Sequence, residues 1–168
     1  MEIAIRKEQP ADTDAIARLT EAVFRNEQHS SHTEQFIVDA LRRHHQLTVS
    51  LVALEDDIIV GHAAVSPVTI SSGATGWYGL GPISVSPGRQ RRGIGSKLIN
   101  AALNEMRRFG GQGCVVLGDP AYYGRLGFKP YPMLVLPGTP PEYFQALSFG
   151  KDMPAGSVSY HQSFETTK

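Results

Sequence analysis

The pattern of apolar and polar positions changes its period several times along the first half of the chain. Residues 1–7 alternate between aliphatic and polar side chains, which predicts a short strand with one buried face. Apolar side chains then recur at helical spacing over residues 10–24 and 33–41, which predicts two amphipathic helices. Residues 47–54 and 58–70 are rich in Val, Ile and Thr on either side of an Asp-Asp turn, which predicts a β-hairpin.

Strands and helices continue to alternate in the second half of the chain. The pattern predicts a strand over residues 77–85 and the longest helix of the chain over residues 93–109. It also predicts a short apolar strand over residues 114–117. A helix capped by Asp119 follows and ends near residue 127. The prolines of residues 128–136 confine any strand there to a sheet edge. In the tail, we expect a helix over 140–147 and a last strand over 157–164.

One strand contains an anomaly. Gly79, Gly81 and Pro82 lie in the middle of the strand predicted for residues 77–85. Proline cannot donate to a sheet ladder, and glycine leaves room for another backbone to approach closely. We therefore expect this strand to be bulged, or parted from a neighbour, near Pro82. Such a parting would open a slot in the sheet.

Composition narrows the class of protein. A chain of 168 residues with 41% hydrophobic content is long enough to form one domain, residues 1–168, without metals or disulfides. Sixteen basic and sixteen acidic side chains give no net charge, which argues against a nucleic-acid or anionic-lipid surface. The single cysteine, Cys114, favours a reducing, cytoplasmic location and cannot form a thiolate metal cluster. Neither a membrane span nor a metal site is expected.

The segment from Val85 to Ser96 carries the clearest chemical signal. It reads as a strand end, a tight loop and a helix start, with Gly93 and Gly95 allowing the backbone to curl. Unpaired N–H groups would converge at the helix N-terminus, where the dipole adds positive potential. Three arginines, at positions 89, 91 and 92, would add charge. The pattern therefore predicts a cradle for a pyrophosphate.

Two other phosphate motifs fit this loop poorly. A Walker loop counted from Gly88 reaches Gly93, but Ile94 stands where that motif needs lysine. A dinucleotide fingerprint counted from Gly93 would need glycine at position 98, which is Leu98. A nucleoside triphosphatase and a nicotinamide enzyme are therefore both disfavoured.

The loop resembles the Gln/Arg-x-x-Gly-x-Gly/Ala signature of the GCN5-related N-acetyltransferase (GNAT) family, and residues 121–128, with a tyrosine before Leu-Gly-Phe, resemble the family's later helix. The order of elements over residues 1–135 is also similar, whereas residues 136–168 match only loosely. The resemblance implies an α/β (α+β) fold. Its central sheet would be mixed and mostly antiparallel, with six to seven strands, a splay near Pro82 and about four flanking helices.

The resemblance also implies site residues for acetyl-CoA as cosubstrate. Pantetheine would pair with the backbone of the slot strand, the amide of Val85 would polarise the thioester carbonyl, and the pyrophosphate would lie on the loop. The cofactor-binding residues expected in this way are Ile83, Val85, Gln90, Arg91, Arg92, Gly93, Ile94, Gly95 and Ser96. Tyr123 matches the family's general acid, which protonates the departing thiolate, and its neighbour Tyr122 is the second choice.

The resemblance to the family does not identify a general base in this sequence. Some members use a glutamate on the slot strand, but residues 78–82 contain no carboxylate. Glu27, His29, His32 and Asp119 are the candidates through a water, although Asp119 is better explained as a helix cap.

These observations predict an N-acetyltransferase that transfers acetyl from acetyl-CoA to a primary amine of a small molecule or peptide, by direct attack in a ternary complex. A CoA-binding sensor without chemistry is the alternative, motivated by the missing carboxylate. Nucleic-acid binding through the arginines is disfavoured by the zero net charge. The identity of the acceptor is open, and so is assembly, for which a homodimer is one option.

Overall fold

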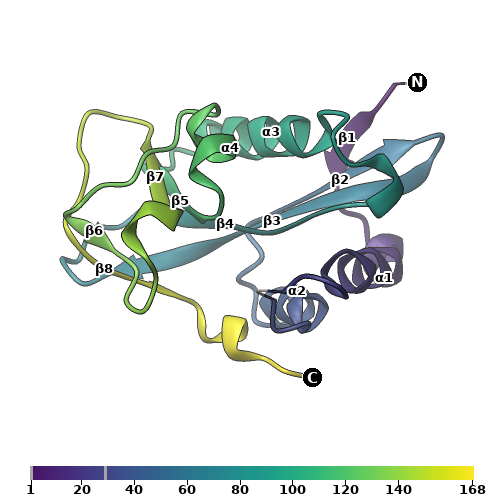
Figure 1. Cartoon of the computed structure of the whole chain (residues 1–168), viewed down its shortest axis with the longest axis horizontal. Coiled ribbons are helices and arrows are strands. Elements are labelled where there is room, and N and C mark those ends of the chain that lie inside the picture. The colour runs from purple at the N-terminus through teal and green to yellow at the C-terminus, as the bar shows by residue number, and fades with distance from the viewer. Residues whose placement is uncertain (1, 29) are drawn as a thin grey trace.

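A computed structural model describes residues 2–28 and 30–168 (Figure 1). Its sheet has eight strands: the main path runs β1-β2-β3-β4-β5-β7, and β8 pairs with β3 and β6. The pairings are antiparallel except for β4 with β5 and β6 with β8. The strands are β1 (Ala4–Lys7), β2 (Val49–Glu55), β3 (Ile58–Ile70), β4 (Trp77–Val85), β5 (Gly113–Leu117), β6 (Leu134–Val135), β7 (Phe144–Ser148) and β8 (Gly156–Tyr160).

Helices cover both faces of this sheet (Figure 1). Figure 1 shows α3 and α4 above the sheet and α1 and α2 below it. Their bounds are α1 (Thr13–Phe24), α2 (Glu34–Arg43), α3 (Ile94–Arg108) and α4 (Pro120–Gly124). The buried stripe of α3, with Leu98, Ala102 and Met106, packs on the sheet as the helical period predicts. The predicted mixed, mostly antiparallel fold is confirmed, with eight strands in place of six or seven.

The irregularity expected near Pro82 is present. In the β3–β4 ladder, Ala63 pairs with Ile83 and Val65 with Leu80, so Gly81 and Pro82 together face one residue of β3. This is a β-bulge, and the Gly81–Pro82 peptide is cis. On the other side, β4 pairs with β5 only from Trp77 to Leu80. The strands part where the sequence predicts.

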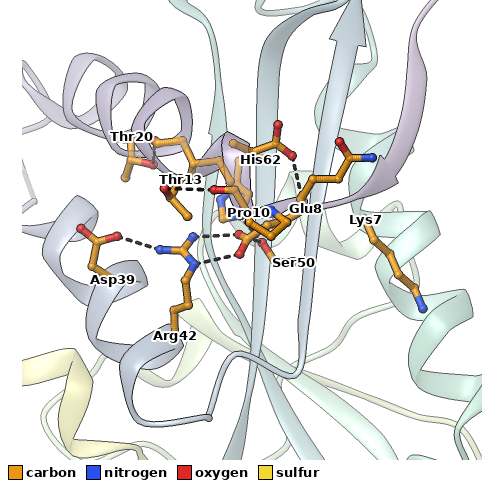
Figure 2. A network of polar contacts seen from close by, with 12 residues as sticks. Lys7, Glu8, Pro10, Thr13, Thr20, Asp39, Arg42, Ser50 and His62 are labelled. Atoms are coloured by element: carbon orange, nitrogen blue, oxygen red, sulfur yellow. Dashed lines mark hydrogen bonds and ion pairs between the residues drawn. The ribbon is translucent and has the colours of Figure 1, made fainter.

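A polar network joins α2 to the sheet (Figure 2). The Arg42 guanidinium donates to both carboxylate oxygens of Glu8, at 2.8 Å each, and to Asp39. Ser50 on β2 donates to Glu8 at 2.6 Å and lies 2.8 Å from Nε2 of His62 on β3. Because the Ser50 hydrogen is committed to Glu8, its oxygen accepts from the imidazole. His62 is fully buried, and this burial lowers its pKa to about 4.

The tail differs from its prediction. The helix expected over residues 140–147 is instead a 3₁₀ turn, Pro141–Tyr143, followed by β7. Its pairing with β5, from Gly113 opposite Ser148 to Leu117 opposite Phe144, forms a ladder that outweighs the local signal. The strand expected over 128–136 shrinks to β6 and one bridge at Lys129.

The last predicted strand is present but ends early. β8 stops at Tyr160, and residues Gln162–Glu165 form a 3₁₀ helix next to α2. None of the helices formed by the described residues has the length and apolar character needed to cross a bilayer.

Candidate active site

The first wall of the candidate site is the free edge of β4. Ser86 donates from its backbone to Val60 across the β3–β4 ladder, at 2.8 Å. Hydrogen-bonded and non-hydrogen-bonded pairs alternate in an antiparallel ladder, so Ser84 bonds toward β3 while Ile83 and Val85 direct their backbone groups the other way. That is the side from which β5 has parted. The backbone groups of Ile83 and the N–H of Val85 therefore face the side from which β5 has parted.

The loop after β4 leads this wall into α3. Gly93, the N-cap of α3, has φ +79°, a left-handed conformation that glycine adopts without strain. None of the backbone N–H groups of residues 91–96 donates to another residue within the described chain. The first helix bond onto this loop comes from Lys97 to the Gly93 carbonyl. Consecutive free donors at a helix N-terminus form an anion site.

The arginines of this loop are arranged differently from the prediction. Arg89 donates through Nε to one oxygen of Glu55, at 2.9 Å, and Arg92 donates to the other, at 2.6 Å. Glu55 is the last residue of β2 and only 3% exposed. Hydrogen bonds from Arg89 and Arg92 hold its pKa below the usual value. Of the three arginines, only Arg91 makes no ion pair in the described chain.

Gln90 also has a defined role in this loop. Its side-chain amide donates to the Val85 carbonyl at 3.2 Å, which ties the loop back to the end of β4. Gln90 therefore has a contact within the protein, and the alternation of the β3–β4 ladder leaves the Val85 N–H outside that ladder.

The second wall is built from side chains of the segment after β5. Tyr123 on α4 is half-buried, and its ring packs edge-on against Tyr122 and Phe128 at centroid distances of 5.0 and 5.8 Å. A Cβ added at Gly118 would overlap the Tyr123 ring, so the glycine there is what lets the ring lie against the chain leaving β5. Burial raises the pKa of the Tyr123 phenol above its ordinary value. The phenol is therefore protonated at neutral pH.

Tyr122 points to a different part of the site from Tyr123. Its hydroxyl lies 3.0 Å from Ser96 Oγ, in the first turn of α3. A Cβ on Gly95 would be only 3.1 Å from that hydroxyl, so the small residue at position 95 allows the approach. Tyr122 therefore stands beside the anion site, where sequence reasoning assigned it no contact.

Two residues of the tail support the second wall. Gln145 on β7 donates to the Gly118 carbonyl at 3.1 Å, and the Gly118 N–H donates to the Tyr143 carbonyl at 2.9 Å. These bonds fix the turn on which the Tyr123 ring lies. Sequence reasoning missed them because it expected a helix at Gln145, and the register of β7 is set by pairing that no local signal shows.

The candidate bases do not gather at the slot. The Asp119 carboxylate accepts from the Ala121 N–H at 3.0 Å and caps α4, which confirms the simpler interpretation. The Nδ1–H of His32 donates to the Phe24 carbonyl at the end of α1, and both His32 and Glu27 are exposed. The remaining candidate, His29, lies outside the described residues.

Part of the slot strand is covered by the C-terminal strand β8. A Cβ on Gly79 would lie 2.8 Å from Cε1 of Tyr160 and 3.1 Å from Val68. The aromatic ring of β8 therefore occupies the space that a larger side chain at position 79 would need.

Comparison with known proteins decides the family. Residues 13–128 match the family model described as the acetyltransferase (GNAT) family. The chain belongs to the GNAT family of acetyltransferases. The N-acetyltransferase YhbS of Escherichia coli K12 is 34% identical over 126 residues, which cover 74% of this chain and 72% of YhbS. The predictions of family and of acyltransferase class are confirmed.

Two solved GNAT structures share the whole architecture. A GNAT acetyltransferase from Brucella melitensis, in complex with acetyl-CoA, has a TM-score of 0.87 and 50% identity, covering 97% of this chain and 98% of that one. Escherichia coli YhbS, in complex with CoA, has a TM-score of 0.88 and 31% identity, covering 100% and 94%. Both GNAT relatives were thus solved with the cosubstrate that the sequence predicts, or with its product.

Proposed function

We propose that this GNAT protein transfers the acetyl group of acetyl-CoA to a primary amine by direct attack in a ternary complex. The observation that carries the proposal is the slot beside β4. There the backbone groups of Ile83 and the N–H of Val85 face away from β3, and they are followed along the chain by the N–H groups of residues 91–96, which have no acceptor in the described chain. An acylated pantetheine arm can hydrogen-bond to the backbone groups of β4, and a diphosphate can accept from the N–H groups of residues 91–96.

Tyr123 is the proposed general acid. Direct attack of a neutral amine on the thioester forms the C–N bond and breaks the C–S bond; the amine nitrogen gives up one proton to water, and the CoA thiolate takes one proton from the general acid. The Tyr123 phenol is protonated at neutral pH and can supply that proton. The Val85 N–H, which lies outside the β3–β4 ladder, polarises the thioester carbonyl in this proposal.

Calorimetric titration of the folded protein with acetyl-CoA and CoA tests the cosubstrate. We expect saturable binding of both, because the slot and the anion site are preformed. Adenosine without a diphosphate is the control ligand and should bind far more weakly. Absence of binding at high micromolar acetyl-CoA would remove the proposal.

A CoA-binding module without turnover is the second candidate. It is favoured by the lack of a carboxylate on β4 and by the Tyr160 ring over Gly79. Release of CoA thiol across a panel of polyamines, amino acids, aminoglycosides and lysine peptides separates the two. An enzyme releases thiol with at least one acceptor class, whereas a sensor binds CoA and stays at background. The acceptor, the homodimer and the cytoplasmic location stay predictions.

A further inference from the structure

The buried carboxylate of Glu55 has no part in the chemistry proposed above, yet it is tied to the anion site. It ends β2 immediately before the tight turn to β3, in which Asp56 and Asp57 both have positive φ. A ladder on each side of β2 fixes its position. Each of its oxygens accepts from a different arginine, and these arginines lie on either side of Gln90 and Arg91.

The hydrogen bonds of Arg89 and Arg92 to Glu55 attach the loop to the end of β2, and we call the two arginines braces for this reason. A guanidinium that donates to a buried carboxylate at 2.6 to 2.9 Å is held in a fixed orientation, and the single Glu55 carboxylate offsets part of the charge of the two arginines. The loop is thereby pinned at positions 89 and 92, and the Gln90 bond to Val85 pins it between them. Residues 91–96, which carry the free N–H groups, begin inside this clamp.

From this arrangement we infer that Glu55 is a positioning residue for the diphosphate loop, with Arg89 and Arg92 acting as its braces and not as phosphate ligands. The inference rests on the proposed function, because it assumes that the loop binds the diphosphate of CoA. Holding the loop in its bound shape removes an ordering cost from binding. Affinity for CoA therefore depends on a carboxylate that does not touch it.

The two roles for the arginines predict opposite results. If Arg92 is a phosphate ligand, Arg92→Ala weakens CoA binding, whereas Glu55→Ala frees two positive charges beside the diphosphate and leaves binding equal or tighter. If Arg92 is a brace, both substitutions open the same clamp. Glu55→Ala then weakens CoA binding by about tenfold, Arg92→Ala weakens it by no more than that because the Arg89–Glu55 bond remains, and the double variant binds no more weakly than Glu55→Ala alone.

The experiment measures CoA affinity by calorimetry for wild type, Glu55→Ala, Arg92→Ala and the double variant, with melting temperature recorded for each. Glu55→Gln keeps one acceptor oxygen and should fall between wild type and Glu55→Ala. The matched control is Glu105→Ala at the far end of α3, where a carboxylate also takes two cations, Arg108 at 2.8 Å and Lys7 at 3.7 Å. It should leave CoA affinity unchanged.

Salt dependence gives a second readout. A brace leaves the slope of CoA affinity against salt unchanged in Arg92→Ala, whereas loss of a phosphate ligand reduces that slope. Unchanged or tighter binding in Glu55→Ala, or a lower melting temperature alone, would overturn the inference. Failure of wild type to bind CoA would instead remove the proposed function, and this inference with it.

Discussion

The two walls of the slot differ in the groups they present: one presents backbone groups and the other presents side chains. The β4 wall and its loop offer main chain, namely the edge of Ile83 and Val85 and the N–H groups that begin α3. The wall after β5 offers side chains, with the Tyr123 ring lying on Gly118. The first wall should tolerate changes of side chain as long as its φ angles survive. The activity should be sensitive to the loss or addition of a single side-chain atom in the second wall.

The largest effect should come from Tyr123, the proposed general acid on the second wall. Tyr123→Phe removes one hydroxyl and keeps the ring packing against Phe128. We expect turnover to fall roughly a hundred-fold or more, with CoA affinity nearly unchanged, because general acid catalysis acts on the departing thiolate. Steady-state kinetics beside calorimetry checks this, and Tyr122→Phe is the matched control. Equal loss of turnover and affinity would mean that Tyr123 holds the cosubstrate.

The next effect tests how closely the second wall must be placed. Gly118→Ala brings a Cβ into the Tyr123 ring, which must then move. A displacement of this size should cost roughly ten- to a hundred-fold in turnover. Gly124→Ala is the control, because nothing lies within 4 Å of its added Cβ and its φ is ordinary. Similar kinetics for both variants would show that the ring need not lie where it does.

A smaller effect is expected where the main-chain wall depends on conformation. Gly93→Ala meets no atom within 4 Å but places a Cβ at φ +79°. The strain of about 1–2 kcal/mol should appear as roughly tenfold weaker CoA binding. In the same loop, Gly88→Ala also meets no atom and has no positive φ, so it should bind CoA like wild type. Equal affinities in the two variants would contradict a main-chain cradle.

The smallest effect is expected from a side chain of the main-chain wall. Val85→Ala keeps the N–H toward the slot and the carbonyl bonded to Gln90. CoA affinity should change by less than in Gly93→Ala, as calorimetry would show. A larger loss would mean that the isopropyl group, and not the backbone, forms this wall.

The sequence predicts the features that depend on local patterns, and it does not predict those that depend on contacts between distant segments. The bulge at Pro82, the αL position at Gly93 and the stripe of α3 are local patterns, so each is where the sequence indicates. Glu55 lies 34 residues from Arg89, and only the folded β2–β3 hairpin brings them together. The helix predicted over 140–147 fails for a similar reason, since β7 exists through its ladder with β5.

The neutral imidazole of His62 sets an acid limit for the stability of the fold. Its pKa falls from 6.5 to about 4 through burial, which outweighs the attraction of Glu8. The unfolded chain therefore binds more protons between these values, and stability declines as pH drops through that window, by up to about 3 kcal/mol. Urea unfolding from pH 7 to 4.5 would show the slope. His62→Gln should flatten it, whereas His45→Asn, at an exposed left-handed position, should not. Because His62 is joined through Ser50 and Glu8 to Arg42, acid would thus loosen the anchorage of α2 on the sheet.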